Sequence, residues 1–377
     1  MPTYDVIVLG CGGVGSAALY HLAKRGVQVL GLDQFPPGHN RGSSHGRTRI
    51  IRQAYFEHPD YVPLLLRAYE LWQELSDHYG KQLYHEIGLL QIGPPDGHVV
   101  PGVLQAARSH GLAVDHLTAQ QPQRCFSAFH VPSGWEAVFE QRAGYLDVED
   151  CVLAHLVEAQ KLEAELRTGV IVQSWQANGD SVTVETNQGT FQAAKLVISA
   201  GSWADSFLNH LDFGLKIRRK EVFWFPIGDD SFRADRGCPA YLFETSDGIF
   251  YGIPLVDKWG LKVARHNGGQ LVTDPLAIDR EVDHNERQDI QRFLSHHLPG
   301  IDRPFIDHSV CLYTMSPDEN FIVDVHPQYP QVSFATGLSG HGFKFTCVLG
   351  EILADLALEG HTRHPIGFLN CRRFRTV

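Results

Sequence analysis

A glycine-rich segment near the start of the chain, Gly10-Cys11-Gly12-Gly13-Val14-Gly15, constrains the fold more than any other feature. It follows an apolar, β-branched run over residues 4–9 and precedes a helical pattern over 17–25. A second strand-like run over 27–32 completes a βαβ unit of about thirty residues. The chain therefore begins as a nucleotide-binding α/β fold does.

The glycines have separate roles in this G-x-G-x-x-G pattern. Gly10 permits the tight turn, Gly12 lets backbone approach a pyrophosphate, and Gly15 allows close packing of helix on strand. Asp33 ends the second strand, where a carboxylate can accept hydrogen bonds from a ribose. Strand, glycines, helix and acid in this order predict a dinucleotide site, whereas glycines alone would also suit an ordinary turn. The pattern does not distinguish NAD from FAD.

The rest of the chain returns to α/β character only at its end. Helical spacing is found over 61–75, 101–110 and 343–358, and a further helix can run from Asp147 or Asp150 to about Leu166. Strand-like runs are found over 87–92, 170–175, 181–186, 190–193, 196–201 and 332–335, with a second β-rich stretch over 221–263. This order predicts a discontinuous Rossmann-type domain of residues 1–85, 147–214 and 307–377, with a β-rich substrate domain of residues 86–146 and 215–306.

Composition excludes several classes of protein. The formal net charge of −11, without a basic tract, argues against nucleic acid or anionic membrane as a partner. The seven cysteines are scattered with no C-x-x-C pair, so we expect neither a disulfide framework nor a metal site, and a reducing compartment. No apolar run reaches membrane-spanning length. We therefore expect a cytoplasmic protein.

Three later segments distinguish FAD from NAD. Their positions are Arg41–Arg49, Asp307–Asp324 (which contains Cys311-Leu312-Tyr313) and Gly337–Lys344. In this order they resemble the monomeric sarcosine oxidase and N-methyltryptophan oxidase family, which is related to D-amino acid oxidase. The resemblance covers essentially the whole chain. One departure is Arg47, where bacterial members carry an acidic residue.

The resemblance implies that FAD is the cofactor and that Cys311 bonds through sulfur to the flavin 8α-methyl group. A thioether there withdraws electrons and favours substrate oxidation, whereas a buried free thiol is the alternative for such a cysteine. The helix after Gly337–Lys344 would direct its N-terminal dipole at the flavin. The implied cofactor-binding residues are Gly10, Gly12, Gly13, Val14, Gly15, Asp33, Ser43, Ser44, Thr48, Arg49, Val172, Ala200, Gly201, Cys311, Gly340, Gly342, Phe343 and Lys344.

The same resemblance implies the substrate and catalytic residues. Arg52 and Lys344 would hold a substrate carboxylate, although a basic residue is more often on the surface. Lys262 would lie near flavin N5 and stabilise charge that develops on O2. The residues expected to shape the field around the flavin are His45, Arg49 and His266, and those expected to line the substrate pocket are Tyr251 and Tyr313. Structural roles stay open for the histidines and tyrosines.

The predicted activity is FAD-dependent oxidation of a secondary amine, with sarcosine or N-methyltryptophan as the substrate type. O2 would be the acceptor, and the products would be hydrogen peroxide and an imine that water hydrolyses. The alternatives are an oxidase of a cyclic imino acid such as pipecolate or proline, a non-catalytic flavoprotein subunit and an NAD dehydrogenase. We expect a monomer whose partners are a small amine and O2.

Overall fold

The predicted βαβ unit is present at the start of the chain. In the computed structural model, which describes residues 4–374, strand β1 (Tyr4–Leu9) leads into helix α1 (Gly13–Lys24) and strand β2 (Val29–Asp33). β1 pairs in parallel with β2 on one side and with β12 (Gly189–Ile198) on the other. All side chains from Val6 to Leu9 are buried, which explains the continuous apolar run of this strand.

The βαβ unit belongs to an eight-stranded sheet. Its order is β10-β11-β12-β1-β2-β9, with β20 beside β12 and β19 beside β20. The remaining strands are β9 (Glu165–Thr168), β10 (Val172–Asn178), β11 (Ser181–Thr186), β19 (Ile322–Val325) and β20 (Val332–Thr336). The sequence predicted separate strands over 190–193 and 196–201. One strand, β12, spans the first predicted strand and the start of the second. Its first half pairs antiparallel with β11, and its second half pairs in parallel with β1 and β20.

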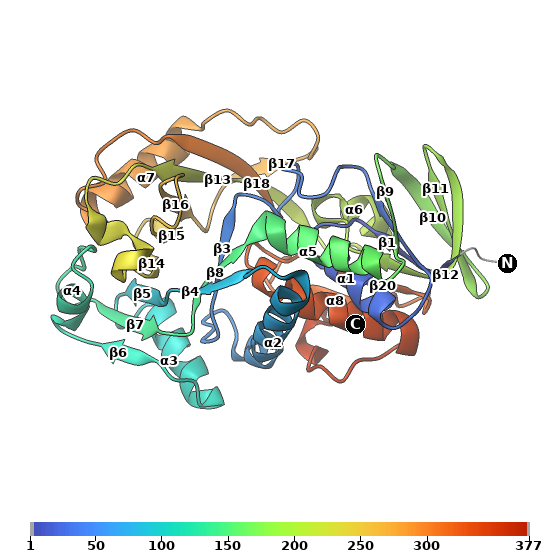
Figure 1. Cartoon of the computed structure of the whole chain (residues 1–377), viewed down its shortest axis with the longest axis horizontal. Helices are drawn as coiled ribbons and strands as arrows, with labels where there is room; N and C mark the ends of the chain where they lie inside the picture. Colours follow the sequence, from blue (N-terminus) through green and yellow to red (C-terminus); the bar gives the residue numbers. More distant parts are fainter. Residues whose placement is uncertain (1–3, 375–377) are drawn as a thin grey trace.

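Four helices pack together beside this sheet (Figure 1). α1 contacts α5 (Val148–Lys161) and α8 (Thr346–Glu359), and α2 (Val62–Tyr79) contacts α5 and α8. α5 ends at Lys161, earlier than predicted, because the chain turns there and forms the edge strand β9 against β2. The short helix α6 (Asp205–Leu208) comes soon after strand β12 in the chain.

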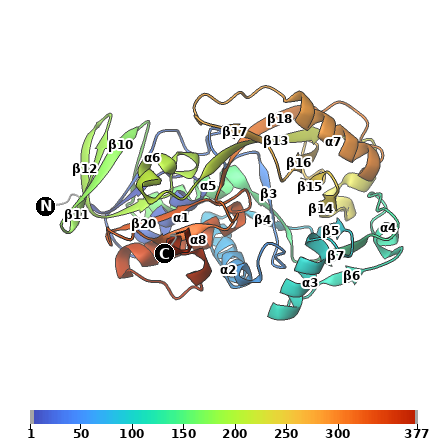
Figure 2. The same ribbon diagram turned by 180° about the vertical axis from the view of Figure 1, so that it is seen from behind.

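A second, nine-stranded sheet lies at the other end of the molecule (Figures 1 and 2). Its order is β17-β13-β16-β15-β14-β5-β7-β6, with β18 paired to β13. The strands are β5 (Leu89–Gly93), β6 (Asp115–Leu117), β7 (Glu136–Glu140), β13 (Lys216–Phe225), β14 (Ala240–Thr245), β15 (Gly248–Ile253), β16 (Leu261–Arg265), β17 (Gln270–Val272) and β18 (Asp307–Met315). Its helices are α3 (Val99–His110), α4 (Gln121–Cys125) and α7 (His284–His297).

A small sheet connects the two ends. Strand β8 (Gly144–Asp147) pairs antiparallel with β3 (Thr48–Ile51) and with β4 (Tyr84–Glu86). Figure 1 shows these strands in the middle of the molecule, and Figure 2 shows β3 and β4 there from behind. β3 contains the last two residues of the segment Arg41–Arg49, so the small sheet holds predicted flavin-binding residues at the junction of the two large sheets.

The strands of the two large sheets follow the predicted segments with one departure, whereas the predicted boundaries after residues 85 and 146 fall inside β4 and β8. All strands of the eight-stranded sheet come from the three segments that were assigned to FAD binding. Residues 1–3 and 375–377 of those segments lie outside the described residues. β18 also lies within the segment 307–377, but it pairs along its whole length with β13 and so extends the other large sheet. The division itself stays a prediction. Among residues 4–374, no helix combines the length and apolar character needed to cross a bilayer.

Candidate functional site

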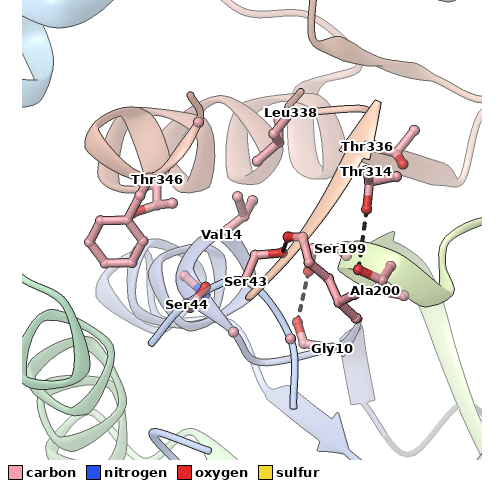
Figure 3. Close-up of a pocket in the computed structure, with 18 of the residues that line it drawn as sticks. Gly10, Val14, Ser43, Ser44, Ser199, Ala200, Thr314, Thr336, Leu338 and Thr346 are labelled. Atoms are coloured by element: carbon pink, nitrogen blue, oxygen red, sulfur yellow. Dashed lines mark hydrogen bonds between the residues drawn. The ribbon is translucent and has the colours of Figure 1, made fainter. Parts of the chain in front are cut away.

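A cavity of about 390 Å³ lies where the two large sheets meet. Residues from segments far apart in the sequence form its wall, chiefly within 9–14, 32–44, 49–57, 170–173, 199–207, 312–314 and 335–346. Figure 3 shows Gly10, Val14, Ser44, Ser199 and Thr346 gathered around this space. Its size is within the range of cofactor and ligand sites in proteins.

The glycine-rich loop forms one end of the cavity and is fixed by side chains. Asp33 Oδ2 accepts a hydrogen bond from the Cys11 N–H at 2.7 Å, and Ser44 Oγ accepts one from the Gly13 N–H at 3.0 Å. Gly12, at the N-cap of α1, has no side chain with which to cap the helix, so apart from the Gly13 N–H the first-turn N–H groups can face an anion. At Gly15 a Cβ atom would lie 1.7 Å from the Gly10 carbonyl oxygen, which explains the need for glycine there.

The polar groups of the wall fit a dinucleotide. Three buried side-chain atoms, Trp203 Nε1, Thr336 Oγ1 and Thr346 Oγ1, have no hydrogen-bond partner among the described residues. All three residues line the cavity, and buried polar atoms normally have partners. At Gly12 an added Cβ would meet only Ser44 Oγ, at 3.6 Å, so the backbone there is open to a ligand. We infer that a polar ligand completes these contacts.

Cys311 lies behind Arg49, whose side chain forms part of the cavity wall. Arg49 Nη2 donates to the Cys311 sulfur at 3.2 Å, and Arg49 lines the cavity whereas Cys311 is behind it. Burial alone would raise the pKa of this thiol, but His45, Arg49 and Lys262 together lower it to about 6. The neighbouring cations therefore favour the thiolate of Cys311, the form that acts as a nucleophile.

Lys262 is buried next to the same group of residues. Its Nζ donates to the carbonyl oxygens of Gly46 at 2.7 Å and Thr48 at 2.6 Å. Burial, with a further contribution from Arg49, holds the pKa of Lys262 well below its ordinary value. The lysine does not itself line the cavity, and the turn that accepts its hydrogen bonds lies beside Arg49.

The predicted aromatic and histidine residues come together on the substrate side. His266 is 6.4 Å from Tyr251 and 5.9 Å from Tyr313 between ring centroids, and all three line the cavity. Burial is the main cause that lowers the pKa of His266 to about 3, so its ring is neutral. His45 is buried away from the cavity, with Nε2 near the Gly42 carbonyl oxygen at 3.1 Å and Nδ1 near Ser309 Oγ at 3.3 Å.

Arg52 and Lys344 meet at one place, and a carboxylate is already there. Arg52 Nη2 donates to both oxygens of Glu57 at 2.7 Å each. The guanidinium of Arg52 and the Lys344 ammonium lie 4.2 Å and 5.1 Å from the centroid of the Tyr55 ring. Burial opposes ionisation of Glu57, but Arg52, His341 and Lys344 outweigh it and lower the pKa of this carboxyl to about 2.

Lys344 is held by the backbone and by Tyr55. Its Nζ donates to the His341 carbonyl oxygen at 2.8 Å and to the Tyr55 hydroxyl at 3.4 Å. Burial, followed by the charge of Arg52, lowers the pKa of Lys344 to about 7. A further carboxylate bound beside Lys344 would therefore raise its pKa and favour the ammonium form.

The cavity contains most of the residues that the sequence predicted. The predicted residues that do not line it are Gly15, His45, Thr48, Lys262 and Cys311; the others do. The sequence analysis missed Glu57, Trp203, Thr336 and Thr346. Thr346 begins helix α8 two residues after the end of the predicted Gly337–Lys344 segment, and that position was the one available signal.

The comparison with known proteins identifies the family. The FAD dependent oxidoreductase family matches residues 5–356. Monomeric sarcosine oxidase of Streptomyces avermitilis is 42% identical over 378 residues, which cover 99% of this chain and 98% of that protein. N-methyl-L-tryptophan oxidase of Yersinia pestis is 36% identical over 383 residues, which cover 99% of this chain and all of that protein.

Solved structures agree on the fold. NikD, described as an unusual amino acid oxidase, superposes with a TM-score of 0.85 at 25% identity over 98% of both chains. Glycine oxidase from Geobacillus kaustophilus superposes with a TM-score of 0.82 at 19% identity over 99% of both chains and shows the fold alone. The predicted fold class, family and FAD dependence are confirmed. The chain belongs to the FAD-dependent oxidoreductases, in the group that contains monomeric sarcosine oxidase and N-methyl-L-tryptophan oxidase.

Proposed function

We propose that this enzyme oxidises N-methyl amino acids, with O2 as the electron acceptor. The observation that carries the proposal is that Arg52 and Lys344 both lie against the Tyr55 ring at the wall of the cavity, where Arg52 binds the carboxylate of Glu57. Two cations at a water-poor site select an anionic group. The carboxylate of an amino acid can replace that of Glu57 at the same donors.

FAD, when bound, accepts two electrons from the amine and passes them to O2. The overall reaction converts the N-methyl amino acid, O2 and water into the primary amino acid, formaldehyde and hydrogen peroxide. Arg52 and Lys344 orient the amino acid by its carboxylate. Tyr251, Tyr313 and the neutral ring of His266 enclose the amine and exclude water from it.

Cys311 and Lys262, which lie behind Arg49 and outside the cavity lining, would serve the cofactor and O2. The lowered pKa of Cys311 supports a covalent bond in which its sulfur would replace one hydrogen of the flavin 8α-methyl group, and the two electrons released would pass to O2 to give hydrogen peroxide. Lys262 would supply positive charge to O2 as it is reduced, with its ammonium oriented by the Gly46 and Thr48 carbonyl groups. Arg49 adds a second positive charge between Cys311 and the cavity.

A substrate panel coupled to peroxide detection tests the proposal. The panel contains sarcosine, N-methyltryptophan, L-proline, L-pipecolate and methylamines without a carboxylate, and catalase added to one set is the control for peroxide. We expect turnover of N-methyl amino acids and little turnover of the simple amines. Faster turnover of proline or pipecolate would favour the cyclic imino acid oxidase. A yellow protein that oxidises none of these compounds would favour a non-catalytic flavoprotein.

Two further properties stay proposals. The relatives named monomeric sarcosine oxidase support a monomer for this chain as well. The cytoplasmic location rests on the scattered cysteines of the sequence. Light scattering of the purified protein tests the first, and fractionation of the source cells tests the second.

A further inference from the structure

Three residues on neighbouring strands form a row across the nine-stranded sheet. Trp224 on β13 lies directly opposite Lys262 on β16 and directly opposite Asp307 on β18. Residues directly opposite each other on antiparallel strands project from the same face of a sheet. Lys262, Trp224 and Asp307 therefore point to one side, toward the turn that precedes β3.

Arg47 covers this row. Its guanidinium lies 4.2 Å from the Trp224 ring centroid and 3.9 Å from that of Trp259, so two indole rings contact it. Its Nη2 forms an ion pair with Asp307. Trp259 is 39% exposed, whereas Lys262 is 1% exposed. Arg47 and Trp259 thus cover the Lys262 side chain and separate it from solvent.

The backbone of Arg47 belongs to the turn that binds Lys262. The two carbonyl groups that accept from Lys262 Nζ are those of Gly46 and Thr48, on either side of Arg47. The N–H groups of Gly46 and Arg47 donate to the carboxylate of Glu149. Arg47 has a φ of 68°, a left-handed conformation that a residue with a side chain seldom adopts. The turn therefore needs contacts that hold it in place.

We propose that Arg47 is a positioning residue for Lys262. With its side chain fixed by Trp224, Trp259 and Asp307, Arg47 keeps the Gly46–Thr48 turn over the lysine, and the turn keeps the ammonium group in place and dry. The proposal rests on the proposed role of Lys262 toward O2. It assigns a function to the residue at which the sequence departs from the family pattern that it otherwise resembles.

The shape of arginine matters as well as its charge. A planar guanidinium can stack on indole rings while an edge donates to a carboxylate, and a lysine ammonium cannot do both. Asp307 balances the charge of Arg47, so the main effect on Lys262 comes through position and exclusion of water. Arg47→Lys should therefore rescue the function only in part.

The experiment compares the holoenzyme with its Arg47→Met, Arg47→Lys, Trp259→Ala and Lys262→Met variants. Stopped-flow absorbance follows anaerobic reduction by sarcosine and, separately, reoxidation by O2. An amine-reactive acetylating reagent followed by peptide mass spectrometry measures the accessibility of Lys262. Arg233→Met is the matched control, because Arg233 pairs with the exposed Asp235 and has no contact with the row.

We expect Arg47→Met to slow reoxidation about tenfold, while reduction changes less than twofold, because a displaced charge loses most of its effect. Acetylation of Lys262 should rise severalfold in Arg47→Met and in Trp259→Ala, and stay at the native level in Arg233→Met. Unchanged acetylation in both variants, or equal slowing of both half-reactions, would overturn the inference.

The Lys262→Met variant separates this inference from the proposed function. If Lys262→Met reoxidises at the native rate, the role of Lys262 toward O2 is wrong, and acetylation alone then decides whether Arg47 positions the lysine. If Lys262→Met is slow but Arg47→Met reoxidises normally, the role of Arg47 is wrong and that of Lys262 stands. Trp259→Ala changes an exposed residue, so it keeps the test valid if Arg47→Met fails to fold.

Discussion

Arg52 Nη2 donates to both carboxylate oxygens of Glu57 at 2.7 Å each, at the wall of the cavity that is proposed to receive the substrate carboxylate. Arg52 Nη1 also donates to the Ala54 carbonyl oxygen at 3.1 Å, so one guanidinium holds the whole segment 52–57. The pair is buried, and a buried charge needs a partner at all times. A substrate carboxylate can therefore replace Glu57 at Arg52 without leaving the arginine unpaired.

Neutralising Glu57 should make this exchange easier. Glu57→Gln keeps the shape of the side chain but removes its charge, so the substrate carboxylate no longer competes with a charged partner. We expect the KM for sarcosine to fall roughly tenfold, about 1.4 kcal/mol, with kcat nearly unchanged. Steady-state peroxide assays measure both constants. Glu70→Gln, which changes an exposed carboxylate paired with Arg67, is the control. A higher KM in Glu57→Gln would contradict the exchange.

Truncating Arg52 should have the opposite effect. Arg52→Met removes the donors of the carboxylate clamp, so the KM for N-methyl amino acids should rise at least a hundredfold, the scale of a charge-assisted pair in a buried site. Arg52→Lys should recover only part of the loss, because the flat fork also stacks on Tyr55 and Phe56. Amines without a carboxylate should lose little. Equal losses for both kinds of amine would show that Arg52 does not recognise the carboxylate.

The charge of Lys344 should appear in the pH dependence of ligand binding. The pKa of Lys344 is about 7, lowered first by burial and then by Arg52. Its ammonium form prevails below that pH, while a simple carboxylate ligand such as propionate stays ionised from pH 6 to 9. Binding of propionate should therefore weaken as pH rises through 7. Flavin absorbance titrations measure this, and Lys344→Met should bind weakly with no such dependence. A dependence that survives in Lys344→Met would assign it to another group.

The features that sequence could predict are those with a local pattern. The βαβ start was predictable because strand, glycines, helix and Asp33 follow one another at set spacing. Helix α7 was not predicted, because its buried residues are few: Ile290, Phe293, Leu294 and His297. The two strands predicted around 190–201 are one strand, since a change of partner along a strand leaves no mark on apolar alternation.

The site was predictable only where the family resemblance named residues. Lys262 and Cys311 were named, but sequence could not show that they lie behind the wall while Arg49 lines it. Glu57 was missed because a single carboxylate five residues after Arg52 has no pattern of its own. Its importance depends on burial, which lowers the dielectric around the pair and is a tertiary property.

Covalent attachment of FAD should depend on the thiolate of Cys311. The pKa of this thiol is about 6, because His45, Arg49 and Lys262 outweigh the effect of burial. Protein prepared without flavin and then mixed with FAD should bind it covalently faster as pH rises from 5 to 7. Acid precipitation separates bound from free flavin, and the yellow colour should stay in the pellet. Cys311→Ala should release it, whereas Cys347→Ala, a buried cysteine of helix α8, should not. Colour lost from the native protein would reject the bond.

Acid should destabilise the helices behind the site. His21 on α1 and His155 on α5 are buried and neutral, since burial lowers the pKa of His21 to about 4 and that of His155 to about 3. Each has a ring nitrogen without a hydrogen-bond partner among the described residues. His155 lies 5.3 Å from the ring of Trp72, whose Nε1 donates to the Lys344 carbonyl oxygen at 2.9 Å.

Between pH 6.5 and about 4, both histidines are protonated in the unfolded chain but stay neutral in the folded protein. Protons therefore favour the unfolded state, and the free energy of unfolding falls as the pH drops below 6.5. From pH 6.5 to 5 this costs roughly 2 kcal/mol for each histidine. His266 and His341 are buried with lowered pKa values in the same way, about 3 and about 4, so His155→Phe removes one of at least four such groups. It should flatten the fall of Tm over that range by about a quarter, while His361→Phe on the surface should not. Calorimetric melts at pH 7.5, 6.5, 5.75 and 5 measure the slope. Equal slopes in His155→Phe and the native protein would mean that His155 is already protonated in the fold and does not contribute to the loss of stability in acid.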